Sequence, residues 1–224
     1  MKIGVLDSGI GGLHTLKVLK EVIPYAQYFF TSHGKALGNK SEKQIYAATK
    51  EMVKELLLEK VELIVIACNT ATAFCIDKLR AEFTVPFVGI EPFIKYPLLN
   101  PREDQKIALL ITRALSKSER FQQLLEKFDK EHLIDIITCP RLASLIEKIY
   151  LGENVWNEIE AELSPLKNKN YSHVLLGCTH YPIIQDYIAN HFSVKTIHPT
   201  HAVAKRVEVL VNGISKTQDK STNP

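Results

Sequence analysis

Short apolar segments alternate with longer amphipathic segments along most of the chain. In the short segments Val, Ile and Leu follow one another almost without interruption, which is typical of strands buried on both faces. In the longer segments apolar residues recur every three or four positions, which predicts helices. Strands are predicted at 2–7, 26–30, 61–67, 87–90, 107–112, 132–138, 173–177 and 194–198. Helices are predicted at 11–23, 41–60 with Ser41 as N-cap, 71–83, 116–128, 140–150, 154–166, 181–192 and 201–214.

The alternation of strands and helices favours an α/β fold with parallel sheets. A proline-containing segment near Pro92 to Glu103 separates the first four strands from the last four. We therefore expect two pseudo-symmetric α/β domains, with sheets flanked by helices and the active site in the interdomain cleft. The first domain is expected at 1–95 and the second at 96–200. The helix at 201–214 is predicted to complete the first domain, and the polar segment 215–224 to form a flexible tail.

Two cysteines, Cys68 and Cys178, each follow a continuous apolar segment. The thiols are thus predicted at the carboxyl ends of strands, where open α/β sheets bind ligands. Each thiol is followed by two hydrogen-bonding residues, Asn69 and Thr70 in the first half and Thr179 and His180 in the second. A matched pair of thiols favours a reaction with a proton acceptor on one face of a carbon and a proton donor on the other. Racemisation and epimerisation are reactions of this kind.

Each of these cysteines alone could be an ordinary buried residue, because free Cys behaves as a small apolar side chain. The shared context of Cys68 and Cys178 favours a functional role for the pair. By contrast, Cys75 falls within a predicted helix and Cys139 precedes Pro140, so packing or turn roles are expected for them.

Polar residues near the other strand ends are further candidates. Asp7 and Ser8 end the first strand and are followed by glycines, which suits a polar ligand as well as a tight turn capped by Ser8. The segment does not match the dinucleotide fingerprint G-x-G-x-x-G. His180 could orient Cys178 or assist proton transfer, or could simply bond at a helix start. Glu147 lies on a predicted helix, where an exposed, solvated carboxylate is the default.

The composition excludes several classes of protein. Of 224 residues, 46% are hydrophobic, and 28 Lys and Arg against 25 Asp and Glu give a net charge of +3, so neither nucleic acid nor a membrane is an expected partner. Asp7 interrupts the first apolar segment, which argues against a signal peptide and for a cytoplasmic protein. Four cysteines without a C-x-x-C pair favour reduced thiols, and no metal site is predicted.

Six motifs between residues 7 and 182 resemble those of the glutamate racemases, cofactor-independent members of the aspartate/glutamate racemase superfamily. They are DSGIGG at 7–12, GNKS at 38–41, ACNTAT at 67–72, VPFVGIEP at 85–92, CP followed by Glu at 139–147, and GCTHYP at 177–182. The resemblance implies that Cys68 and Cys178 are the two acid/base thiols, and that Glu147 is an auxiliary residue. It implies substrate contacts from Asp7, Ser8, Leu37, Gly38, Asn69, Thr70, Thr179 and His180.

The resemblance also implies a small-molecule substrate, glutamate or a related amino acid, no cofactor, and a bacterial, cytoplasmic enzyme that supplies D-glutamate for peptidoglycan. A homodimer is a further expectation. The chain departs from the family at several positions: Thr31 replaces an aspartate, Ala36 and Leu37 replace the start of a Pro-Tyr-Gly triplet, Ala114 and Leu115 replace a Gly-Thr pair, and His198 replaces a late aspartate. The lost hydroxyl groups leave two alternatives open, a racemase of aspartate or another amino acid, and a catalytically inactive amino-acid-binding relative.

Overall fold

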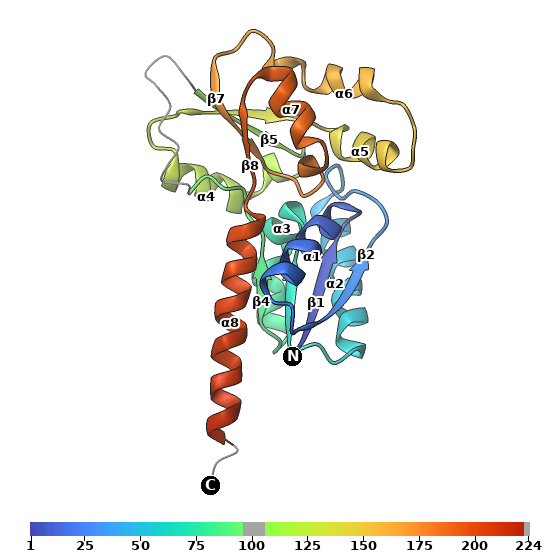
Figure 1. Ribbon diagram of the computed structural model, residues 1–224, viewed down its shortest axis with the longest axis vertical. Helices are drawn as coiled ribbons and strands as arrows, with labels where there is room; N and C mark the ends of the chain where they lie inside the picture. Colours follow the sequence, from blue (N-terminus) through green and yellow to red (C-terminus); the bar gives the residue numbers. More distant parts are fainter. Residues whose placement is uncertain (96–105, 222–224) are drawn as a thin grey trace.

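The computed structural model describes residues 1–95 and 106–221, with side chains to residue 213, and contains two lobes, each built on a four-stranded parallel sheet (Figure 1). The first sheet has the order β2-β1-β3-β4 and the second the order β6-β5-β7-β8. The strands of the first sheet are β1 (Lys2–Asp7), β2 (Gln27–Ser32), β3 (Leu63–Ile66) and β4 (Phe87–Gly89). The strands of the second sheet are β5 (Lys106–Ile111), β6 (Ile134–Thr138), β7 (Tyr171–Leu176) and β8 (Lys195–Ile197). Because both sheets share one strand order, the predicted pseudo-symmetric α/β architecture is confirmed.

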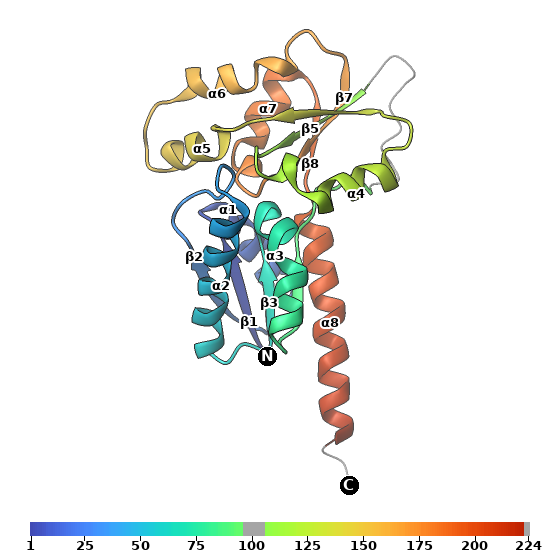
Figure 2. The ribbon, with the colours of Figure 1, turned by 180° about the vertical axis from the view of Figure 1, so that it is seen from behind.

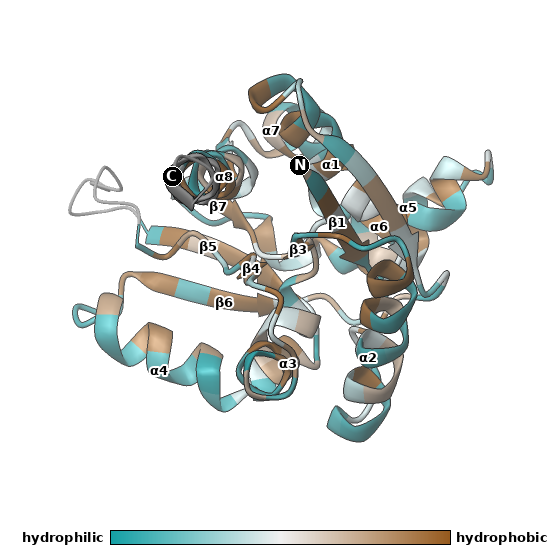
Figure 3. Cartoon of the chain, turned by 90° about the horizontal axis from the view of Figure 1, so that it is seen from below, coloured by the Kyte–Doolittle hydropathy of each residue, from teal (hydrophilic) through white to brown (hydrophobic). Residues whose placement is uncertain are grey.

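Helices cover both faces of each sheet. The first lobe carries α1 (Gly11–Val22), α2 (Glu42–Leu58), α3 (Asn69–Glu82) and the last helix, α8 (Thr200–Ser221). The second lobe carries α4 (Glu119–Phe128), α5 (Leu142–Tyr150), α6 (Trp156–Glu162) and α7 (Gln185–Phe192), with short 3₁₀ segments η1 (Leu115–Lys117), η2 (Ser164–Leu166) and η3 (Tyr181–Ile184). In the view from below, the strands are mainly apolar and the outward faces of α2 and α4 carry polar residues (Figure 3).

Apolar residues on both faces of the first sheet explain the continuous apolar segments in the sequence of its strands. Ile3 and Val5 of β1 pack in one cluster with residues of α1 and α8, whereas Leu6 packs in a second cluster with residues of α2 and α3. Successive side chains of a strand point to opposite faces, so a strand covered on both sides needs apolar residues at every position. Ser41 caps α2 as predicted, through a capping box with Gln44.

The last helix returns from the second lobe and runs alongside the first (Figures 1 and 2). Val203, Ala204, Val207 and Val211 are buried in the cluster that also contains Ile3. The helix continues to Ser221, whereas the sequence predicted its end at 214 and a tail from 215. No proline interrupts 200–221, and the helix accommodates Gly213. Residues 222–224 of that tail, and 96–103 of the predicted linker, lie outside the described residues. No helix in the described part is both long and apolar enough to cross a membrane.

Two predicted helices are interrupted near prolines. The helix predicted at 154–166 ends at Glu162 and continues as η2, which contains Pro165. The helix predicted at 181–192 begins as η3, which contains Pro182, and becomes α-helical at Gln185. Within a helix, proline has no backbone N–H group to donate and its ring crowds the preceding turn, which accounts for the break before Pro165. Pro182 lies in the first turn, where proline is tolerated, so it does not by itself account for η3.

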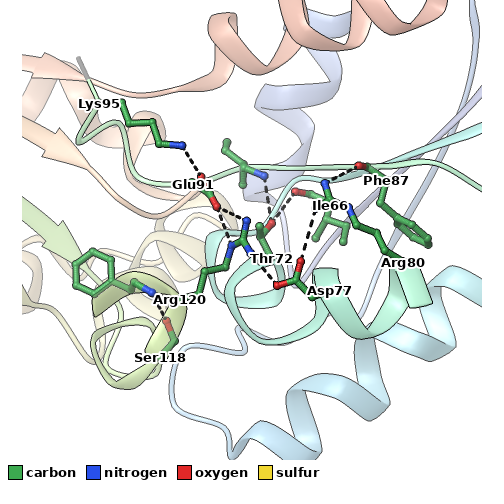
Figure 4. Close-up of polar contacts among 11 residues, drawn as sticks. Ile66, Thr72, Asp77, Arg80, Phe87, Glu91, Lys95, Ser118 and Arg120 are labelled. Carbon is green, nitrogen blue, oxygen red and sulfur yellow. Dashed lines mark hydrogen bonds and ion pairs between the residues drawn. The ribbon is translucent and has the colours of Figure 1, made fainter. Parts of the chain in front are cut away.

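A cluster of charged side chains joins the two lobes (Figure 4). Arg120 of α4 donates from Nε to Oε1 of Glu91 at 2.8 Å and from Nη1 to Oδ2 of Asp77 at 2.8 Å. Glu91 follows β4 and also pairs with Lys95, and Asp77 lies on α3. A guanidinium can bind two carboxylates at once because its donors form a planar fork. Arg120 therefore fixes α4 of the second lobe against α3 and the end of the first sheet.

Candidate active site

The two candidate thiols occupy equivalent positions in the two lobes. Leu6 of β1 pairs with Ile66 of β3, and Leu110 of β5 pairs with Leu176 of β7. Cys68 comes two positions after Ile66 of β3, and Cys178 comes two positions after Leu176 of β7. Contacts between Thr179 and Asp7, described below, join the carboxyl ends of the two sheets, so the two thiols face a common seam between the lobes.

Cys68 lies in a polar but largely dry environment. It is the N-cap of α3, where its sulfur accepts a hydrogen bond from the Ala71 N–H group at 3.4 Å, and its thiol donates to the Ser8 hydroxyl at 3.6 Å. The residue is 5% exposed. Burial and the nearby Asp7 carboxylate raise the pKa of the Cys68 thiol well above its usual value, with a smaller contribution from Cys178. Cys68 is therefore held as a neutral thiol, close enough to Cys178 for the two to interact electrostatically.

Asp7 links the two lobes at this point. Its Oδ1 accepts from the Ser8 hydroxyl at 3.1 Å and from the Gly9 N–H at 3.3 Å, and its Oδ2 accepts from the Thr179 hydroxyl at 2.8 Å. Burial raises the pKa of Asp7 to about 6, although the His180 charge and these hydrogen bonds act in the opposite direction. At neutral pH Asp7 is mainly a carboxylate, and it orients Ser8 toward Cys68.

Cys178 has a different neighbour, a buried histidine. His180 Nδ1 lies 3.7 Å from the Cys178 sulfur, and His180 Nε2 lies 2.9 Å from Oε1 of Glu147 on α5. Burial alone would lower the pKa of His180, but its hydrogen bonds with Cys178 and Glu147 and the charges of Cys178 and Asp7 together raise that pKa to about 10. His180 is thus an imidazolium at neutral pH, and it places a positive charge beside the Cys178 sulfur.

The side chain of Glu147 is less exposed than the sequence predicted. The amphipathic pattern predicted an exposed carboxylate, but the side chain is 22% exposed and faces the buried His180. The carboxylate fixes the imidazole ring and its protonation in the way that an acidic partner orients a catalytic histidine.

Asn69 and Thr70 lie beside Cys68 at the start of α3. Asn69 is 3% exposed, and neither the oxygen nor the nitrogen of its amide has a hydrogen-bond partner among the described residues. A buried amide without partners costs about 1–3 kcal/mol, so Asn69 is suited to bind a polar ligand. The Thr70 hydroxyl lies 2.9 Å from the Thr112 hydroxyl of the second lobe and forms another bridge across the seam.

Thr112 was not among the predicted site residues. It comes two positions after Leu110, just as Ser8 comes two positions after Leu6, so it is the counterpart of Ser8 in the second lobe. Its hydroxyl also accepts from the Leu115 N–H group at 3.2 Å. Alignment of the two halves by their strands would have identified it.

The structure brings together all the predicted polar residues, but it places Leu37 differently. The Leu37 side chain has no hydrogen-bonding group, and it is 1% exposed and packs in the apolar core of the first lobe. Gly38 accepts a hydrogen bond from the Ala114 N–H group at 2.7 Å, and a Cβ at Gly38 would lie 2.8 Å from Cβ of Thr112. Leu115 is also buried, in a core of the second lobe. Two hydroxyl groups expected from the family are thus replaced by core side chains.

The family model for Asp/Glu/Hydantoin racemase matches residues 23–207. The chain belongs to this racemase family. It is 35% identical over 191 residues to a glutamate racemase of Herpetosiphon aurantiacus, a match that covers 84% of this chain and 75% of that protein. The resemblance found from the motifs is therefore confirmed.

Solved structures of the racemase family share the two-lobed fold. The glutamate racemase of Escherichia coli, in complex with L-glutamate and the activator UDP-MurNAc-ala, superimposes with a TM-score of 0.83 at 27% identity, over 94% of this chain and 82% of that one. The enzyme of Francisella tularensis, in complex with D-glutamate, gives a TM-score of 0.78 at 28% identity, over 96% of this chain and 82% of that one.

A substitution at Gly11 tests whether activity requires the close contact between the two lobes. A Cβ at Gly11, in the first lobe, would lie 2.6 Å from the carbonyl carbon of Thr179 and 2.7 Å from the backbone nitrogen of His180, in the second. Backbone atoms cannot rotate aside, so Gly11→Ala is expected to hold the lobes apart and lower kcat/KM about 10²-fold, since a misplacement of about 1 Å can cost that much. Circular dichroism melts and rate assays check this.

Gly213→Ala is the matched control, because a Cβ at Gly213 would meet no atom within 4 Å. It should retain full activity. Equal activity of the Gly11→Ala and Gly213→Ala proteins would contradict the requirement for close contact between the lobes.

Proposed function

We propose that this chain is a glutamate racemase that interconverts L- and D-glutamate by proton transfer between two thiols and the α-carbon. The observation that carries the proposal is the placement of Cys68 and Cys178 at equivalent strand ends, facing one seam from opposite lobes. The kinship with enzymes named glutamate racemase, two of them solved with L- or D-glutamate, supports glutamate as the substrate.

The two thiols have different neighbours. The His180 imidazolium lies 3.7 Å from the Cys178 sulfur, whereas Cys68 is buried beside Asp7, and both burial and that carboxylate raise the pKa of the Cys68 thiol. The Cys178 thiolate removes the α-proton of one enantiomer, so that the Cα–H bond breaks and an S–H bond forms. The Cys68 thiol then gives its proton to the opposite face of the carbanion and becomes a thiolate. The reverse reaction exchanges these roles, and Asp7, Ser8 and the Ala71 N–H group then surround the Cys68 thiolate.

The remaining polar groups hold the amino acid and its developing negative charge. Asn69, whose amide has no partner in the described structure, supplies both a donor and an acceptor to the substrate. Thr70 and Thr179 supply hydroxyl groups from the two lobes, and Gly38 allows the close approach of Thr112. Donors fixed in a buried site stabilise a carbanion more strongly than water does, because they are already oriented.

Several wider features belong to the same proposal. The chain divides into domains at 1–95 and 96–200, with the last helix completing the first domain. The enzyme acts in the cytoplasm on a small-molecule substrate, assembles as a homodimer, and supplies D-glutamate for peptidoglycan.

A racemase of another amino acid is the second candidate, because Leu37 and Leu115 replace polar side chains. Purified protein incubated separately with L-glutamate, D-glutamate, and both enantiomers of aspartate and alanine separates the two candidates. A circular dichroism signal decaying to zero from both glutamate enantiomers is expected. Decay with aspartate or alanine alone would replace glutamate as the substrate, and decay with none of them would support the inactive relative.

A further inference from the structure

A hollow at the outer edge of the seam is lined by basic side chains from both lobes. It has a volume of about 360 Å³. Lys40, Glu42 and Phe74 line it from the first lobe, and Arg113, Ala114 and Lys117 line it from the second. The Ala114 N–H group is fixed by its hydrogen bond to the Gly38 carbonyl, so the lobes are joined at the floor of this hollow. None of the predicted site residues lines it.

Within the described residues, the three basic side chains of the hollow are not paired with a carboxylate. Lys40, Arg113 and Lys117 form no ion pair or side-chain hydrogen bond among residues 1–95 and 106–213. The carboxylate of Glu42 pairs instead with Lys78 at 2.6 Å. The hollow therefore holds three positive charges whose mutual repulsion is not relieved by the protein.

Three unpaired cations around one concave surface suit a ligand with more than one negative charge. Arg113 can bind a carboxylate or phosphate through two N–H groups at once, and the lysines act as mobile point charges. Phe74 and Ala114 add an apolar floor that could contact a short carbon skeleton. A monoanion would neutralise only part of this charge.

We propose that this seam hollow binds a small polyanion, a phosphate or polycarboxylate compound, separately from the racemase chemistry. Because Lys40 belongs to one lobe and Arg113 and Lys117 to the other, an ion bound between them holds the lobes together. The proposal goes beyond the racemase function and does not depend on it.

Calorimetric titration of the purified full chain with pyrophosphate and with citrate, at constant ionic strength, tests the proposal. Both probes are expected to bind the wild-type protein, and the preferred one reports whether the natural ligand is a phosphate or a polycarboxylate. The triple variant Lys40→Gln, Arg113→Gln, Lys117→Gln should bind at least tenfold more weakly. All three side chains are exposed, so the variant is expected to fold, which its circular dichroism spectrum verifies.

A second triple variant, Lys130→Gln, Lys169→Gln, Lys205→Gln, removes the same charge from exposed positions outside the hollow and should bind within twofold of wild type. Absence of binding to the wild-type protein at about 10 mM of either probe would overturn the proposal, whether or not the chain racemises glutamate. An equal loss in both triple variants would also overturn it, since binding would then follow net charge alone.

Discussion

Replacement of Cys68 or of Cys178 by serine is expected to lower the rate of glutamate racemisation by about 10² to 10⁴-fold, the range typical for the loss of a general acid or base. A serine hydroxyl is far less acidic than a thiol, so it neither accepts the α-proton nor returns one at neutral pH. Each variant should fail in both directions, because every turnover needs one thiolate and one thiol. Initial rates from L- and from D-glutamate, measured by circular dichroism, check this result.

Cys75→Ser provides the control for the loss of a buried thiol. Cys75 is 0% exposed on α3 and donates to the Thr49 hydroxyl at 3.6 Å, an arrangement that a serine can keep. Its activity should stay within a few-fold of wild type. Full activity in either the Cys68→Ser or the Cys178→Ser variant would show that the corresponding thiol is not part of the reaction.

The substitution His180→Asn is expected to have the second largest effect, a decrease in kcat of about 10²-fold at pH 8. Asparagine keeps a hydrogen-bonding group but not the positive charge that His180 places beside the Cys178 sulfur. The pKa of about 10 means that the wild-type imidazolium is present below that pH and is lost above it. The Asp7 carboxylate, with its pKa of about 6, forms as the pH rises through 6. The wild-type profile of kcat/KM should therefore rise near pH 6 and fall near pH 10.

The pH profile also separates an electrostatic role of His180 from a structural one. In His180→Asn the fall near pH 10 should disappear, whereas the rise near pH 6 should remain. His132→Asn is the control, because His132 is exposed in the second lobe with a φ of 53°, a conformation that asparagine tolerates. An unchanged alkaline fall in His180→Asn would assign that ionisation to another group.

The sequence predicted the features that depend on local pattern. The continuous apolar segments predicted the strands because helices cover both faces of each sheet. The ends of these segments correctly placed Cys68 and Cys178 at strand ends. Ser41 was recognised as a cap because its hydrogen bond to the Gln44 N–H group involves neighbours in the chain.

Features that depend on how separate elements meet were not predictable in this way. The contact of Glu147 with His180 requires α5 to pack beside η3, and no periodicity within α5 distinguishes that carboxylate from an exposed one. The family resemblance implied a substrate contact from Leu37, but its side chain packs in the core of the first lobe together with residues of α2 and α3. The seam hollow was not predictable either, because its three cations come from different lobes and line one surface only when the lobes are in contact.

The central claim, that the proton leaves on one side of the α-carbon and arrives from a different thiol on the other, is tested most directly by racemisation in deuterated water. Early in the reaction the product enantiomer should carry deuterium at the α-carbon, while the remaining substrate carries almost none, from either starting enantiomer. Deuterium entering the substrate as fast as the product, or protium carried from substrate into product, would mean that one group serves both faces and would contradict the two-thiol account.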